Sequence, residues 1–432
     1  MRILLCLLFL TFLTACEFSS GDDENPYTCS NGGQKRFVRD ATYDWYLWND
    51  LLPKKPKVSK FDDPAELLAS LIEIQPLDNY SYIGSAAADA AFFGLGRYEG
   101  FGFSWQLVAS GDYRLTRVFS GSPAEAAGFS RGQQIVALDG RPVAEIEAAE
   151  GVNAVLDLAT VEFTLRQIDG VTEVTVLVSQ DIVTIDPVPQ WQLIPTASGT
   201  PIGYVELSTF VSTANSALDE AFASFLANGV SDVIVDLRYN SGGLVSTAAL
   251  FGDLLGGAVA ENLTFSQTLF NEDRSEDFDT EIFFTRLANS INLSRLVVIA
   301  TENTASASEL VTNGMEPHVE VTIVGDNTFG KPVGQVGFEF CGNILRVTAF
   351  RNVNADGNGD YFDGLPADCP ATDDLTVPVG DAADPNMIAA VGYLETGACP
   401  AAPAPAAQFA IRPDGNSPDR RGPPWREYAG AW

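Results

Sequence analysis

Between residues 181 and 400 the sequence alternates short apolar runs with segments of helical periodicity. A continuous apolar run of about six residues is typical of a strand that is buried on both faces, as in a parallel sheet. Parallel strands need crossover connections, which helices supply. We therefore predict an α/β core with strands over 202–207, 233–237, 296–300 and 319–324, and a helix whose buried face is formed by Leu218, Phe222, Phe225 and Leu226.

The chain has 432 residues, enough for about three domains. Its Lys and Arg residues number 25 against 57 Asp and Glu, so the net charge is 25 − 57 = −32. Such a surface repels phosphate backbones and anionic headgroups, which argues against nucleic acid as a partner. His318 is the only histidine and Lys331 the only lysine after residue 60, so few groups can serve as a base.

Residues 1–15 have the pattern of a cleaved export signal, with one arginine before an apolar run that is too short to span a bilayer. The run ends in Leu13-Thr14-Ala15-Cys16, which resembles a bacterial lipobox and implies lipid attachment at Cys16. Residues 16–35 then form a flexible tether. We predict a periplasmic protein that touches the membrane only through this lipid; a plain secretory signal is the alternative.

Four further cysteines remain after the signal and the lipidation site. An even number in an exported chain indicates two disulfides, with three pairings open. A metal site is the alternative, but no CxxC pair and no neighbouring histidine supports one. The residues are Cys29, Cys341, Cys369 and Cys399.

Residues 36–90 are predicted to form a small helical domain. Its first helix carries an apolar stripe that includes Trp45 and Trp48, and its second begins at the cap Asp63 with Pro64 in the first turn. At the other end of the chain, residues 401–432 are rich in Ala and Pro and are predicted to form a loose tail.

Residues 91–180 are rich in predicted strands and contain the string Gly100-Phe101-Gly102-Phe103. GSPAEAAG and GQQIVALDG follow at residues 121–128 and 132–140. This order resembles a PDZ domain of the bacterial protease type. The resemblance implies that backbone N–H groups of residues 100–103 receive the carboxyl terminus of a peptide, which adds as a strand.

Three segments carry the groups that a hydrolytic mechanism needs. The strand ending at Ala300 leads through TASASE into a helix, so Ser306 lies at the positive end of that helix. Lys331 follows the next strand, and if the two strands are neighbours both loops leave the same sheet edge. The paired glycines of DLRYNSGG, residues 236–243, can turn an amide toward a developing oxyanion.

DLRYNSGG, TASASE and TFGKPVGQ, in this order behind the PDZ-like segment, resemble the carboxyl-terminal processing, or tail-specific, serine proteases. The resemblance implies a ClpP/crotonase-like core over 181–400, a Ser306–Lys331 dyad supported by Gln335, and oxyanion amides from Ala307 and Gly242, with Gly243 as the weaker candidate. It also implies an endopeptidase for polypeptides with free carboxyl termini that needs no metal or cofactor.

Several alternatives stay open at this point. The chain could be a catalytically inactive PDZ adaptor or a ligand carrier on the same fold, although neither needs an intact Ser306 and Lys331. His318, predicted to lie in an exposed turn, is a weak rival as the base. Residues 354–363 have a calcium-loop pattern without the final carboxylate and are read as a turn. The substrate and the oligomeric state are not fixed by the sequence.

Overall fold

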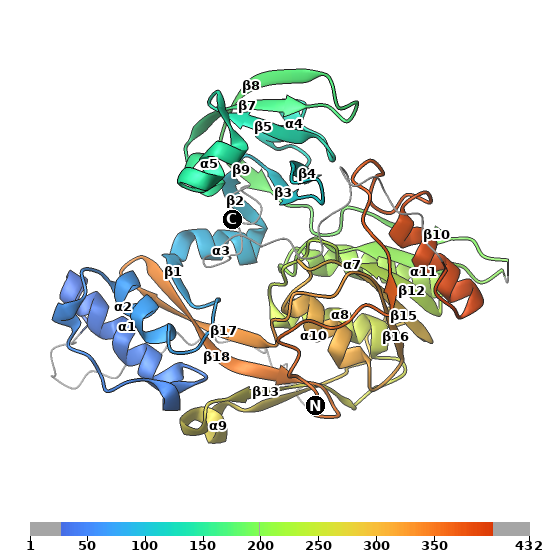
Figure 1. Ribbon diagram of the computed structural model, residues 1–432. Helices are drawn as coiled ribbons and strands as arrows, with labels where there is room; N and C mark the ends of the chain where they lie inside the picture. The colour runs from blue at the N-terminus through green and yellow to red at the C-terminus, as the bar shows by residue number, and fades with distance from the viewer. Residues whose placement is uncertain (1–26, 198, 401–432) are drawn as a thin grey trace, which may run out of the picture.

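The structure is a computed structural model that describes residues 27–197 and 199–400. It confirms a mixed helix and sheet fold, and three parts are visible in Figure 1: two N-terminal helices beside a long hairpin, a β-rich unit, and a larger α/β core. Among these described residues no helix is long and apolar enough to cross a membrane. Cys16, the predicted signal and the tail 401–432 lie outside the described residues.

The core is built on a six-stranded sheet in the order β10-β11-β12-β15-β16-β19, parallel from β11 to β19. Alternate side chains of β12 and β15 face opposite layers: Val233 and Val298 pack with α7, α8 and α10, and Ile234 and Ile299 pack toward α11. The predicted strands are confirmed. The bounds are β10 Trp191–Ile194, β11 Ile202–Glu206, β12 Asp232–Asp236, β15 Arg295–Ala300, β16 Glu320–Gly325, β19 Cys369–Pro370, α7 Ala214–Ala227, α8 Val245–Gly256, α10 Ala307–Met315 and α11 Pro385–Thr396.

The prediction that Leu226 belongs to the buried face of α7 is wrong. Leu226 keeps 44% of its surface exposed, whereas Leu218, Phe222 and Phe225 are fully buried. Leu226 follows Phe225 by one position, about 100° around the helix, which turns it away from the sheet.

The two N-terminal helices, α1 (Asn31–Trp45) and α2 (Pro64–Ile72), share their core with a hairpin that is distant in sequence. Val38 and Leu68 pack against Leu345 and Val347 of β18 (Asn343–Val353), which pairs with β17 (Val333–Phe340). Strand β1 (Tyr82–Ser85) also pairs with β18. The N-terminal segment, defined here as residues 27–85, therefore contacts the hairpin both through its helices and through β1. Helix α1 ends at Trp45, and Trp48 lies in the following turn before η1 (Asn49–Leu51).

The β-rich unit, defined here as residues 97–184, is an antiparallel sheet in the order β3-β4-β5-β7-β8 with an aromatic core. The pair β2 and β9 connects it to the rest of the chain, and β3 is an edge strand. Its elements are β2 Arg97–Gly100, β3 Phe103–Leu107, β4 Tyr113–Val118, α4 Pro123–Ala126, β5 Gln134–Leu138, β6 Arg141–Pro142, α5 Val143–Ala149, α6 Val152–Leu156, β7 Thr160–Arg166, β8 Glu173–Ser179 and β9 Asp181–Thr184; α3 Ala86–Leu95 precedes it.

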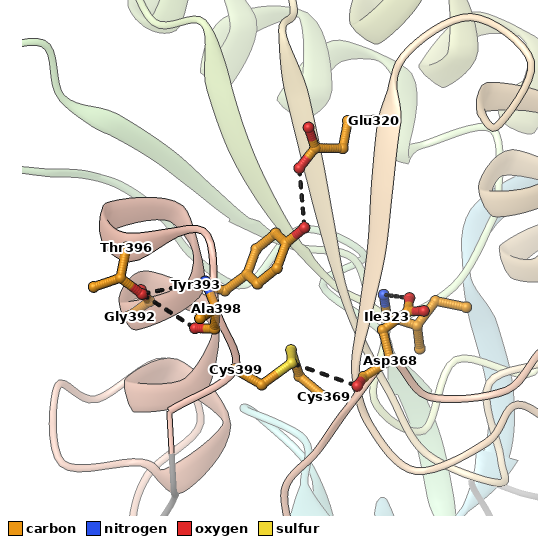
Figure 2. The surroundings of a disulfide bond; sticks show 9 residues. All are labelled: Glu320, Ile323, Asp368, Cys369, Gly392, Tyr393, Thr396, Ala398 and Cys399. Carbon is orange, nitrogen blue, oxygen red and sulfur yellow. Dashed lines mark hydrogen bonds between the residues drawn. A yellow bond between two sulfur atoms is a disulfide. The ribbon is translucent and has the colours of Figure 1, made fainter.

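The four cysteines form two disulfides, as predicted. Cys29, before α1, is bonded to Cys341 in the β17–β18 turn, and Cys369 of β19 is bonded to Cys399 beyond α11. Figure 2 shows the second bond, beside the hydrogen bond of 3.0 Å from Tyr393 Oη to Glu320 of β16. The first bond therefore joins the start of the described residues to the β17–β18 hairpin, and the second joins their end to the core sheet. The remaining elements are η2 Val58–Lys60, β13 Thr264–Phe270, α9 Glu272–Phe278 and β14 Thr280–Phe283.

Candidate active site

Three chain segments meet at the carboxyl edge of the parallel sheet, where ligand sites of α/β folds commonly form. They follow β12, β15 and β16, which are adjacent: Asp236 is paired with Ile299, and Ala300 with Gly325. The strand before Lys331 therefore lies beside the strand before Ser306, which meets the condition for both loops to leave the same sheet edge. Hydrogen bonds then connect the segments to one another.

Ser306 occupies the N-cap of α10 in an unusual backbone conformation. Its φ of 55° and ψ of −112° place a non-glycine residue in a sparsely populated region, where strain is often associated with function. Its side chain is half-buried, and Ala307 behind it begins the helix. Because the first amides of a helix have no acceptor within the helix, the Ala307 N–H is placed beside the Ser306 side chain as a donor.

The loop after β12 holds the serine turn through its backbone. Asn240 O accepts hydrogen bonds from Ala305 N (3.0 Å) and Ser308 Oγ (2.9 Å). Thr304 Oγ1 donates to Leu237 O at 2.7 Å. The serine turn is thus fixed to the neighbouring loop on both sides of Ser306.

Gly242 lies directly against the serine. Its φ is 105°, and a Cβ at this position would lie 2.7 Å from Ser306 Cβ and 2.8 Å from Ala307 N, so only glycine fits. Its N–H donates to Asn240 Oδ1 at 2.9 Å. Gly243, with a φ of 140°, packs instead against the backbone of Phe210. The amide predicted for the oxyanion is therefore close to Ser306 and already has an acceptor within the protein.

Glu309, which the sequence analysis did not single out, connects the serine and lysine segments. Its carboxylate is fully buried and accepts four hydrogen bonds: Oε1 from Thr328 Oγ1 (2.5 Å) and Gly330 N (2.7 Å), and Oε2 from Ser306 N and Lys331 N, both at 2.8 Å. The amide nitrogens of Ser306 and Lys331 can therefore be no farther apart than twice 2.8 Å. Burial raises the pKa of Glu309, although these donors oppose the shift.

The Lys331 side chain lies in a mostly enclosed environment. Its Nζ donates to Gln335 Oε1 at 3.3 Å and lies 4.7 Å from the centre of the Tyr80 ring. Burial lowers the pKa of Lys331 to about 8, although the nearby carboxylates of Asp78 and Glu309 act in the opposite direction. A fraction of the lysine is therefore uncharged near neutral pH, as a base requires.

Tyr80 is the second residue that the sequence analysis missed. Its hydroxyl donates to Gly330 O at 3.3 Å, and its backbone carbonyl accepts a hydrogen bond from Gln335 Nε2. The residue lies between α2 and β1, in a short polar segment without periodicity, and its approach to Lys331 depends on the packing of the N-terminal segment against β17 and β18. No local sequence signal indicates such a contact.

His318, the alternative base considered from the sequence, lies too far from Ser306 to accept its proton. His318 follows the carboxyl end of α10, whereas Ser306 is at the amino end, and nine helical residues extend about 13 Å. Its Nε2 is 2.8 Å from Thr264 O, and its ring packs edge-on against Phe284. The predicted turn is confirmed, but its predicted exposure is wrong, because this packing leaves His318 half-buried.

The remaining predicted residues lie elsewhere. Phe101 and Phe103 are fully buried in the core of the β-rich unit, so their side chains cannot meet a ligand. Within residues 354–363, the Asn354 side chain accepts hydrogen bonds from the amides of Asp356 and Asn358, as in a turn. Within the described ranges, no group of three or more His, Cys, Asp or Glu residues could hold a metal ion.

The β-rich unit contacts the segment that precedes the serine. Gln106 Nε2, on the edge strand β3, donates to Glu302 Oε1 at 2.9 Å, and Asn303 Nδ2 donates to Gln106 Oε1 at 3.4 Å. Arg131 of the same unit forms an ion pair with buried Asp373 at 2.7 Å. The β-rich unit is therefore attached to the rim of the candidate site.

Comparisons with known proteins place these segments in context. A model described as "Peptidase family S41" matches residues 201–370, and a "Peptidase S41 N-terminal domain" model matches residues 33–82. A carboxyl-terminal-processing protease of Picosynechococcus sp. is 29% identical over 223 residues, 51% of this chain and 50% of the relative. The carboxy-terminal processing protease CtpA of Bacillus subtilis is 24% identical over 270 residues, 62% of this chain and 55% of the relative. The chain thus spans about half the length of the curated relatives it matches.

A solved structure shows a similar fold. The crystal structure of an S41 protease candidate from Bacteroides fragilis has a TM-score of 0.65 and 24% identity, over 84% of this chain and 97% of that one. At this identity the likeness bears on the fold alone.

Proposed function

Because the chain belongs to peptidase family S41, we propose that it is a serine endopeptidase in which Ser306 is the nucleophile and Lys331 the base. The observation that carries this proposal is the shared carboxylate oxygen of Glu309, which receives the amides of both residues. The nucleophile and the base thus project from backbone atoms that one buried side chain holds together.

The proposed reaction follows the chemistry of a serine nucleophile with an amine base. Neutral Lys331 accepts the proton of the Ser306 hydroxyl as the serine oxygen attacks the peptide carbonyl. The resulting ammonium then gives this proton to the departing amine, leaving an acyl-enzyme. Lys331 next accepts a proton from water, which attacks the ester, and returns it to Ser306. Gln335 orients the lysine through its Oε1.

The oxyanion would be held by backbone amides beside the serine. Ala307 supplies one donor from the start of α10, and Gly242, which has no space for a side chain next to Ser306, supplies the second. Since the Gly242 amide donates to Asn240 Oδ1 in this structure, binding an oxyanion there requires this bond to be shared or broken.

For the substrates, we propose polypeptides selected by their free carboxyl termini through a PDZ-like module. Support comes from the edge position of β3, which begins at Phe103 directly after Gly102 and leaves one side of the sheet free of a partner strand. A peptide can add to such an edge as an extra strand. Export and lipid attachment at Cys16 complete the proposal and rest on the sequence alone.

An inactive adaptor or a ligand carrier on the same fold is the rival function. Neither needs a lysine whose pKa is lowered to about 8 beside a serine in a strained backbone conformation. Perturbed groups of this kind are typical of catalytic sites.

The test is cleavage of an unstructured polypeptide, together with labelling by a serine-reactive fluorophosphonate probe. Wild type should cleave and be labelled, and Ser306→Ala should do neither. The matched control is Ser216→Ala, an exposed serine of α7, which should behave as wild type. Cleavage and labelling that persist in Ser306→Ala would overturn the assignment.

A further inference from the structure

We propose that Tyr80, contributed by the N-terminal segment, is a positioning residue for the catalytic base: its ring shields Lys331 Nζ from water and its backbone carbonyl holds Gln335. This inference rests on the proposed function for its role in catalysis. The arrangement of the three side chains does not depend on that function.

Tyr80 contacts the base through three separate groups. The ring centre is 4.7 Å from Lys331 Nζ. The hydroxyl donates to the carbonyl of Gly330, the residue before Lys331, at 3.3 Å. The carbonyl accepts from Gln335 Nε2, which leaves Gln335 Oε1 facing Lys331 Nζ at 3.3 Å. The amide of Gln335 is thus fixed in one orientation, with its acceptor toward the lysine.

The electrostatic effect of the ring has two opposing parts. Its face attracts an ammonium, which raises the pKa of the lysine; at a desolvated site this attraction amounts to about one and a half pKa units. Excluding water lowers the pKa and at buried sites reaches several units. Burial is the largest influence on Lys331, so removing the ring should raise its pKa.

The charged groups around Lys331 come from three directions. Asp78 lies two residues before Tyr80, Glu309 is on α10, and Arg346 is on β18, where it forms an ion pair with Asp89 at 2.6 Å. Both carboxylates favour the ammonium and Arg346 opposes it. Because the carboxylates favour the charged lysine, the exclusion of water to which the Tyr80 ring contributes acts against them.

The attachment of the N-terminal segment gives Tyr80 a defined position. Asp78 Oδ1 accepts from Tyr80 N and Ser81 N, both at 3.0 Å, and from Thr348 Oγ1 at 2.9 Å. The loop that carries Tyr80 is therefore hydrogen-bonded to β18, next to the strand that carries Gln335. The base is complete only when this segment is in place.

The direct test measures the titration of Lys331 without reference to activity. With only six lysines in the chain, protein labelled with ¹³C at lysine Cε gives few signals, and Lys331→Arg identifies the one from residue 331. We expect Lys331 to titrate near pH 8 in wild type and in Tyr80→Phe, which keeps the ring. In Tyr80→Leu and Tyr80→Gln, which remove it, the midpoint should rise by about one unit or more.

The matched control is a second tyrosine–lysine pair in the N-terminal segment. Lys55 Nζ lies 5.1 Å from the ring centre of Tyr43, but the Lys55 side chain is 51% exposed. Tyr43→Leu should leave the Lys331 titration unchanged. Circular dichroism identifies which of the two ringless variants at position 80 fold, and either suffices for the measurement.

The same variants are then compared by kcat/KM as a function of pH. The acidic limb should move with the Lys331 titration in Tyr80→Leu, so that activity falls about tenfold near pH 7.5 and recovers at higher pH. An unchanged Lys331 midpoint in a folded ringless variant overturns the inference. A wild type with no Ser306-dependent cleavage would instead overturn the proposed function, while the titration would still decide the role of Tyr80.

Discussion

The buried carboxylate of Glu309 holds two reactive residues by their backbones. A glutamate at the third position of a helix commonly reaches back to the N-cap amide and remains in solvent. Here the same oxygen that accepts from Ser306 N also accepts from Lys331 N. A shift of the Glu309 carboxylate would therefore move the backbone of Ser306 relative to the backbone of Lys331.

Glu309→Gln should lower both stability and activity. A glutamine amide presents one acceptor and one donor group, so its NH2 must face two of the four present donors. Losing hydrogen bonds to a buried charged group and leaving donors unsatisfied should reduce the free energy of unfolding by about 3 kcal/mol. The measurement is denaturant unfolding with kcat on the same samples, with the exposed Glu261→Gln as control. Full activity in Glu309→Gln would contradict this role.

Lys331 should destabilise the fold at neutral pH. Its pKa is lowered to about 8 from about 10.5 in the unfolded chain, so the unfolded state binds more protons between these values and stability rises with pH across that window. Below pH 8 the full penalty is present. Lys331→Met should therefore unfold with a free energy up to about 3 kcal/mol higher at pH 7, and the difference should vanish near pH 10.5.

Chemical denaturation of the two proteins at pH 7 and at pH 10.5 measures this difference. Lys54→Met replaces an exposed lysine and should change stability little at either pH. A Lys331→Met protein that is less stable than wild type at pH 7 would contradict the prediction, because it would show that burying Lys331 does not lower the free energy of unfolding.

At the scale of elements, the local patterns predicted the parts that depend on local physics. Continuous apolar runs gave the strands, and the Asp63 cap with Pro64 marked the start of α2, where Asp63 accepts from Glu66 N as expected. The serine and lysine loops could also be placed together, because neighbouring parallel strands end at one edge.

Long-range packing was the part that local patterns could not predict. Tyr80 meets Lys331 because α1 and α2 share a core with β17 and β18, some 300 residues later, and no periodicity encodes that docking. The burial of Glu309 and the packing of His318 against Phe284 depend in the same way on tertiary neighbours. The hydrogen bond from the Gly242 amide to Asn240 Oδ1 likewise could not be predicted from a sequence pattern.

The two disulfides should contribute unequally to stability. The Cys29–Cys341 bond joins residues 312 apart, and the Cys369–Cys399 bond joins residues 30 apart. The loop-entropy argument gives about 6 and about 4 kcal/mol, respectively. We expect replacing the first pair by serine to destabilise the protein by about 2 kcal/mol more than replacing the second, as measured by guanidinium unfolding without reductant.

Two outcomes would contradict this account of the disulfides. One is a larger loss for the pair Cys369 and Cys399. The other is alkylation of any of the four cysteines in intact, unreduced protein, which mass spectrometry detects.

For the whole molecule, the candidate site is where the three parts meet. The core provides Ser306 and Lys331, the N-terminal segment provides Tyr80, and the β-rich unit reaches Glu302 through Gln106. The unit that we propose captures carboxyl termini is therefore attached next to the proposed nucleophile.

Selection by the carboxyl terminus predicts a strong effect of amidation. A substrate whose last residue is amidated lacks the charge that the amides of residues 100–103 would receive, and its kcat/KM should fall about tenfold or more. The control is amidation of an internal side-chain carboxylate at the same distance from the cleavage site. Equal rates for the free and amidated peptides would contradict the selection.

Substrate modification is a cleaner test here than a variant of the loop itself. A Cβ at Gly102 would lie 2.1 Å from Ser122 Cβ, and φ at this position is +89°. Gly102→Glu would therefore disturb the packing of the β-rich unit as well as any ligand.

The central claim is that one lysine, and not the histidine, accepts the proton of Ser306. The most direct measurement is kcat/KM of Lys331→Ala, Lys331→Arg and His318→Ala on an unstructured peptide between pH 6 and 10. We predict that both lysine variants are inactive, since a guanidinium keeps its charge and cannot act as a base, and that His318→Ala keeps the wild-type profile, which rises with pH toward a midpoint near 8. An active Lys331→Ala together with an inactive, folded His318→Ala would contradict the account.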